Sequence, residues 1–118
     1  MAKEATLGSR VDAVHSVLDP IASRSRTTAA MDTVEGARVI ASGGRDLSPA
    51  QRVALAAGES GAKLSGAHAE TTLLNHAAQN GLAPTRMSVS RNICPACKES
   101  IEKAGGMLTS PTTVIWPR

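Results

Sequence analysis

The fold class is decided by residues 87–116, MSVSRNICPACKESIEKAGGMLTSPTTVIW. Their apolar alternation and their breakers predict a strand, a helix and two further strands, over residues 87–90, 95–104, 107–109 and 113–116. Pro95 suits the first turn of the helix, and Gly105-Gly106 suits its end. Only three residues separate the last two strands, too few for a parallel crossover, so these strands are expected to be antiparallel neighbours.

The first part of the chain adds a helix and a hairpin. An apolar stripe at helical spacing predicts a helix that ends near Asp19, because a proline follows. The stripe consists of Leu7, Val11, Val14, Leu18 and Ile21. The β-compatible stretches 27–34 and 37–42, divided by Glu35-Gly36, predict an antiparallel pair. Together with the C-terminal elements, they predict an α/β domain with a mixed sheet.

Two more helices are predicted between the hairpin and residue 84. Ser48, Pro49 and Gln51 form a capping-box signature, which predicts a short helix over 49–57. Residues 58–66 contain three glycines and are expected to form a loop. A longer helix is expected to begin close to His68 and to end before Gly81 and Pro84. Its apolar side comprises Leu73, Leu74, Ala77 and Ala78.

The composition restricts the possible functions. The chain has 118 residues, of which 42% are apolar, enough for one compact domain over residues 1–118. Its apolar runs fall far short of the roughly 20 residues that a bilayer span needs, so no membrane anchor is expected, and residues 1–10 do not resemble a signal peptide. Because the chain has one tryptophan and neither phenylalanine nor tyrosine, modules that stack bases on aromatic rings are excluded.

Charge and cysteine content point toward a partner and a type of chemistry. The net charge is +3, and residues 51–118 carry seven basic and four acidic side chains, so any attraction for anions belongs to this half. Two cysteines are too few for a disulfide scaffold. Their close spacing, Cys94 and Cys97, suits a shared metal ion or a redox pair.

The sequence motifs His68-Ala69-Glu70 and Cys94-Pro95-Ala96-Cys97 each stand at the predicted start of a helix. A strand followed by a helix, twice over, places both helix N-termini at one edge of a sheet, where an imidazole and two thiols can meet. These three donors suit Zn²⁺ and leave its fourth position open for water, as in catalytic sites. Glu70 is not needed as a ligand and is suited to general acid/base work.

Together these motifs resemble the H-x-E and C-x-x-C signature of the cytidine deaminase-like superfamily, the zinc-dependent nucleobase deaminases. The resemblance implies a three-layer α/β/α fold, with His68, Cys94 and Cys97 as zinc ligands. It further implies that activated hydroxide attacks the amine-bearing ring carbon while Glu70 transfers protons. No nucleotide cofactor is expected. Ile93 departs from the commonest signature, which has a proline directly before the first cysteine.

Within that superfamily, the chain looks most like the deaminase domains of bacterial polymorphic toxins. The similar segments are residues 42–51, SGGRDLSPAQ, residues 66–70, GAHAE, and residues 93–97, ICPAC. The resemblance implies conversion of cytosine to uracil in DNA, with single strands favoured because few bulky residues could open a duplex. It also implies the C-terminal piece of a larger secreted toxin, delivered into the cytoplasm of a target cell and neutralised by a cognate immunity protein.

Several alternatives remain open at this level. The substrate could be double-stranded DNA, RNA or free nucleosides and nucleotides, and the chain could be a non-catalytic zinc-binding module or a C-x-x-C redox protein. The backbone of Ala69 is a candidate substrate contact by resemblance. Gly44 and Arg45 are suited either to a phosphate contact or to a plain turn. Four cations would form a phosphate-binding face only if they cluster: Arg86, Arg91, Lys98 and Lys103.

Overall fold

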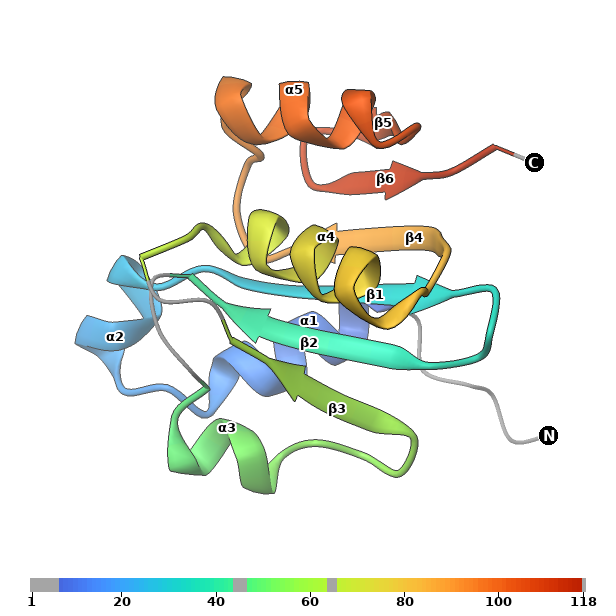
Figure 1. Cartoon of the computed structure of the whole chain (residues 1–118). Coiled ribbons are helices and arrows are strands. Elements are labelled where there is room, and N and C mark those ends of the chain that lie inside the picture. The colour runs from blue at the N-terminus through green and yellow to red at the C-terminus, as the bar shows by residue number, and fades with distance from the viewer. Residues whose placement is uncertain (1–6, 44–46, 64–65, 118) are drawn as a thin grey trace, which may run out of the picture.

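The computed structural model describes residues 7–43, 47–63 and 66–117. Within these residues, five helices flank one six-stranded sheet (Figure 1). The helices are α1 (Leu7–Ser16), α2 (Pro20–Ser25), α3 (Pro49–Val53), α4 (Ala69–Asn80) and α5 (Pro95–Lys103). The strands are β1 (Thr28–Thr33), β2 (Arg38–Ser42), β3 (Glu59–Ala62), β4 (Pro84–Val89), β5 (Met107–Ser110) and β6 (Thr113–Ile115).

The sheet is mixed, as predicted, with the strand order β3-β2-β1-β4-β6-β5. Strands β1 and β2 form the expected antiparallel hairpin, and Gly36 in its turn has a φ of +87°, which glycine adopts without strain. The predicted antiparallel pairing of the two C-terminal strands, β5 and β6, is also confirmed. Across the described strands, the pairing of β2 with β3 is the one parallel contact.

Helices cover both faces of the sheet, so the domain has three layers. Met31 and Val39 belong to the core beneath α4 and α5, together with Leu73 and Ile101 of those helices. Alternate residues of the same strands, such as Ile40, belong to a second core beneath α1. The central strands are therefore apolar on both faces, which is why their pattern reads as nearly continuous in the sequence.

Two sequence predictions about the first helix are wrong. Helix α1 ends at Ser16 rather than near Asp19, and a separate short helix, α2, follows. The Asp19 carboxylate caps α2 by accepting a hydrogen bond from the Ala22 N–H at 2.8 Å, and Pro20 fits its first turn. Ile21 is consequently 80% exposed and does not belong to the buried stripe of α1.

The segment predicted as a loop over 58–66 contains strand β3, parallel to β2. Its sequence, Glu-Ser-Gly-Ala, has little strand propensity, so tertiary pairing determines its structure. The preceding helix, α3, carries the predicted capping box between Ser48 and Gln51. It ends at Val53 instead of extending to residue 57, which gives the chain room to enter β3.

The chain's one tryptophan fixes the C-terminal end of α5 against the sheet. Trp116 is 7% exposed, and its Nε1 donates a hydrogen bond to the Ala104 carbonyl at 3.0 Å. A Cβ atom at Gly106 would lie 2.6 Å from Ile101 Cγ2 and 3.0 Å from the indole ring, so only glycine fits there. Trp116 thus belongs to the buried core of the domain.

Candidate metal centre

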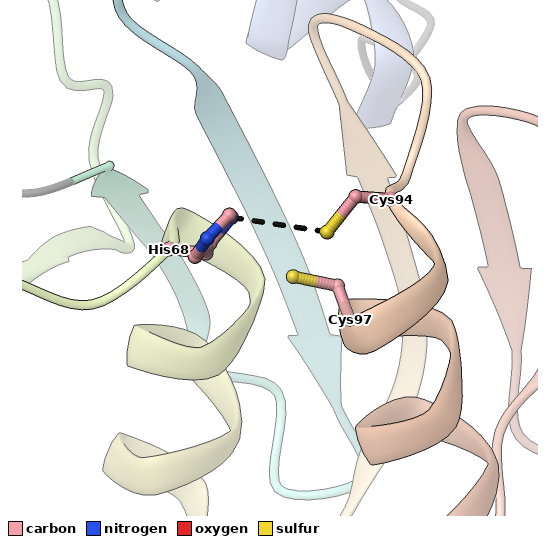
Figure 2. A group of neighbouring side chains, drawn as sticks. All are labelled: His68, Cys94 and Cys97. Carbon is pink, nitrogen blue, oxygen red and sulfur yellow. Dashed lines mark hydrogen bonds between the residues drawn. The ribbon is translucent and has the colours of Figure 1, made fainter.

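The N-termini of α4 and α5 bring three donor side chains together, as Figure 2 shows. The ligand atoms of His68, Cys94 and Cys97 all lie within 4.8 Å of one another, and these three residues could hold a metal ion. Cys94 Sγ lies 3.9 Å from His68 Nδ1. The predicted convergence of residues 26 positions apart in the sequence is therefore confirmed.

Local helix geometry explains how the first two donors are presented. His68 and Cys94 are the N-cap residues of α4 and α5, with extended backbone angles, and neither side chain makes a capping hydrogen bond. An N-cap side chain ordinarily accepts a bond from its own helix. Here the two side chains point toward each other across the gap between the helices (Figure 2). Pro95 occupies the first turn of α5, where its missing N–H costs no hydrogen bond.

Glu70 lies in the first turn of α4, two residues after His68. It is only 3% exposed, and its Oε1 has no hydrogen-bond partner among the described residues. A buried carboxylate oxygen without a partner carries a desolvation cost that nothing in the surrounding protein offsets. The Glu70 Oε1 atom is therefore available to accept a hydrogen bond from a molecule that enters the site.

The electrostatics of the site also fit a cation. Burial raises the pKa of the Cys97 thiol to about 12, with further increases from its hydrogen bond to Cys94 and from the negative charge of Glu70. The Thr71 hydroxyl opposes this effect through a hydrogen bond to Cys97. Two thiols and a carboxylate share a small volume, so their charged forms coexist only when a positive charge lies among them.

A pocket of about 320 Å³ adjoins His68, one of the three donors. Its wall includes His68, Ala69, Gly43 and Arg91, so the structure places the predicted backbone contact Ala69 beside open space. A Cβ atom at Gly43 would lie 3.6 Å from the Ala69 backbone nitrogen. The predicted phosphate contacts at residues 44 and 45, Gly44 and Arg45, fall outside the described residues.

The four cations considered for a phosphate-binding face do not form one cluster. Arg91 borders the pocket beside His68. Arg86 borders a different pocket, formed by α1, β4 and β6. Lys103 pairs with Glu99 at 3.3 Å on the exposed side of α5. The pocket beside His68 is also lined by Ser25 and Thr27, which were not predicted from the sequence. Small hydroxyl residues at element ends carry no sequence signal that separates them from ordinary turns.

In the described part of the chain, no helix is long and apolar enough to cross a membrane. No family model, curated protein or solved structure matches the chain.

Proposed function

We propose that this chain is a zinc-dependent cytosine deaminase that acts on single-stranded DNA. The observation that carries the proposal is the joint placement of His68, Cys94 and Cys97 with a buried Glu70 whose Oε1 has no partner among the described residues. A structural zinc site has four protein ligands and no need of a buried carboxylate beside them. A hydrolytic site needs an open position and a nearby proton carrier.

The proposed metal is Zn²⁺, held by His68, Cys94 and Cys97. One imidazole nitrogen and two sulfur donors match the preferences of zinc, and the 3.9 Å between His68 Nδ1 and Cys94 Sγ is close to the ~3.5 Å expected between ligands about 2.0 and 2.3 Å from one tetrahedral ion. When bound, zinc supplies a Lewis acid that lowers the pKa of water at its open position.

Glu70 has the proton-transfer role in this proposal. Hydrolytic deamination forms a C–O bond from water, breaks the C–N bond of the exocyclic amine and releases ammonia. The water oxygen stays on the ring, and its protons must reach a ring nitrogen and the leaving amine. The unpartnered Oε1 of Glu70 is free to accept a proton from water and to donate it to these nitrogens in turn. Burial keeps bulk water from competing for this proton.

The preference for single strands rests on access. A base paired and stacked in a duplex must be flipped out before its amine can reach a pocket. Enzymes that open a duplex insert bulky side chains between base steps. The chain's single tryptophan is packed in the core against Ala104 and Gly106, and the sequence contains no phenylalanine or tyrosine. An unpaired cytosine is therefore the substrate that this site fits best.

The cellular setting that we propose follows from the resemblance of residues 42–51, 66–70 and 93–97 to toxin deaminase domains. In this setting, a larger secreted protein delivers the domain to the cytoplasm of a target cell, and an immunity protein neutralises it. We expect expression in bacterial cells to raise the frequency of C-to-T mutations, and Glu70→Gln to abolish that effect. Equal mutation frequencies with the two proteins would contradict the toxin role.

The test of the activity compares the zinc-loaded protein with Glu70→Gln on matched substrates. Single-stranded DNA, duplex DNA, RNA and free cytidine are incubated with each protein, and conversion of cytosine to uracil is measured. We expect conversion of the single strand by the parent alone, with equal zinc content in both proteins. Activity that survives in Glu70→Gln would overturn the role of Glu70. Zinc binding without conversion of any substrate would instead identify a binding module.

A further inference from the structure

Arg91 stands two residues after the end of β4 and lines the pocket beside His68. Its Nη2 donates hydrogen bonds to the backbone carbonyls of Arg24 and Arg26, the latter at 3.3 Å. These carbonyls lie at the C-terminal end of α2, where the helix dipole favours a positive charge. The guanidinium of an exposed arginine is thus anchored at the margin of the pocket.

The anchoring leaves donors available. The Nε and Nη1 groups of Arg91 make no hydrogen bond within residues 7–43, 47–63 and 66–117. A guanidinium N–H that has no partner can donate to a phosphate oxygen, and a charge-assisted bond of this kind is about twice as strong as a neutral one. Arg91 can therefore hold α2 and an anion at the same time.

The other described residues of the pocket wall are uncharged or a histidine. Its wall contains the hydroxyl residues Ser25 and Thr27, and none of its lining residues is acidic. Of the described residues that line the pocket, Arg91 is the one arginine or lysine. An anion that enters the pocket therefore meets the positive charge of Arg91 without a repelling carboxylate on the described wall.

We infer that Arg91 binds a backbone phosphate of single-stranded DNA next to the target cytosine. This inference rests on the proposed deaminase activity and deepens it, because it makes the polymer, rather than free cytidine, the substrate. The proposed zinc ligands and Glu70 would face the cytosine base, which nucleosides, nucleotides and DNA all contain, so these residues do not select among the three. Among the described residues of the pocket wall, Arg91 is the one whose side chain would distinguish a nucleotide chain from a nucleoside, because it is the one arginine or lysine there.

Arg86 provides a matched control. It is an exposed arginine near the start of β4 and lies opposite Asp32 of β1. It borders a pocket whose lining residues include none of the three metal-ligand candidates. Arg91→Gln and Arg86→Gln each remove one positive charge, so long-range charge effects on DNA binding should be equal in the two variants. Gln at position 91 keeps an N–H₂ group that can still donate to the carbonyls of α2.

The first experiment measures binding without turnover. A fluorescent single-stranded oligonucleotide with one cytosine is titrated into Glu70→Gln protein that also carries Arg91→Gln or Arg86→Gln, at several salt concentrations. We expect Arg91→Gln to weaken binding about tenfold and to lower the slope of log K against log salt by about 0.7. Arg86→Gln should leave the slope unchanged. Equal effects of the two substitutions would overturn the inference.

The second experiment measures turnover of the oligonucleotide, deoxycytidine monophosphate and cytidine by the parent and by Arg91→Gln. We expect Arg91→Gln to raise KM for the oligonucleotide about tenfold and to leave the kinetics with cytidine unchanged. An effect on the monophosphate alone would assign the contact to a free nucleotide and reject the polymer. Arg91-dependent DNA binding without deamination of any substrate would reject the proposed function and retain the phosphate contact.

Discussion

Two glutamates whose carboxylates are shielded from solvent, Glu59 and Glu70, have opposite surroundings. The Glu59 side chain is 3% exposed and has a partner at each oxygen. Arg10 donates to both oxygens at 2.8 Å, and the Ala56 N–H donates to Oε1 at 2.8 Å. Glu70 as a whole residue is 3% exposed, yet its Oε1 has no partner in the described chain.

The difference separates a carboxylate that serves the fold from one that we propose serves a reaction. Around Glu59, two arginines reach the carboxylate from α1 and β2, so its charge ties the edge strand β3 to both. Around Glu70, the nearest ionisable groups include Cys97, whose thiol is itself disfavoured as an anion. The same fold gives Glu59 a hydrogen-bond partner at each oxygen and leaves Glu70 Oε1 without one. We therefore interpret the missing partner of Glu70 as a functional feature.

The largest expected effect tests the function of the unpartnered carboxylate. We expect Glu70→Gln to lower kcat for cytosine deamination by about a thousandfold, in line with the loss of a general acid/base. The amide has nearly the same shape and removes a buried charge, so the free energy of unfolding should not fall. Steady-state kinetics and urea denaturation of the same preparations check both statements. A variant that loses activity only through loss of stability would erase the contrast with Glu59.

The second prediction concerns the metal ion that we propose lies beside Glu70. We expect Zn²⁺ to stabilise the parent protein by about 4 kcal/mol when the free ion is a thousand times its Kd, because a ligand bound only by the folded state shifts the unfolding equilibrium. Cys97→Ser should abolish this increase, whereas His76→Ala, which removes a half-buried histidine from α4, should retain it. Thermal unfolding with and without added zinc measures the increase. Stabilisation that persists in Cys97→Ser would exclude Cys97 as a ligand.

The third prediction is a loss of stability without a loss of activity, the opposite of the result expected for Glu70→Gln. Glu59→Gln should lower the free energy of unfolding by about 2 kcal/mol, because the Arg10 guanidinium loses its charged partner in a largely buried place. Zinc content and kcat should stay at the parent values, since Glu59 lies outside the metal centre. Urea denaturation and metal analysis provide the measurements. A loss of zinc from this variant would show that β3 and the metal centre are coupled.

The smallest expected effect is a dependence of stability on pH. Hydrogen bonds from Arg10 hold the pKa of Glu59 below its ordinary value, although burial alone would raise it. The stabilisation is complete above the ordinary glutamate pKa of about 4.3 and is lost as the pH falls from there through the lower folded-state value. The difference in unfolding free energy between the parent and Glu59→Gln should therefore shrink below about pH 4.3. A difference that stays constant down to pH 3 would contradict this assignment.

The two regions also differ in how far the sequence predicts them. The metal centre is predictable because His68 and the two cysteines stand next to helix-start signals such as Pro95, and those signals depend on local sequence. The Glu59 region is not, because β3 lacks strand propensity and forms only by pairing with β2. The burial of Glu70 was likewise beyond prediction, since it depends on how α4 packs against the sheet and α5.

Long-range geometry also decides between similar residues. The sequence offers Arg86 and Arg91 as equivalent cations on either side of one strand, and only the folded chain brings Arg91 to the carbonyls at the end of α2. In the same way, Leu18 and Ile21 continue the apolar spacing of α1 in the sequence. The capping of α2 by Asp19 interrupts the helix and turns Ile21 to the surface.

The anchoring of Trp116 gives this protein a built-in optical reporter. The indole is the chain's one tryptophan, and no tyrosine or phenylalanine contributes to the near-ultraviolet emission. Because its N–H is bonded to Ala104 and its ring packs on Gly106, its fluorescence reports on the end of the helix that begins with both cysteines. Ordering or loosening of α5 can therefore be followed in real time in the unlabelled protein, because all of the intrinsic fluorescence comes from Trp116.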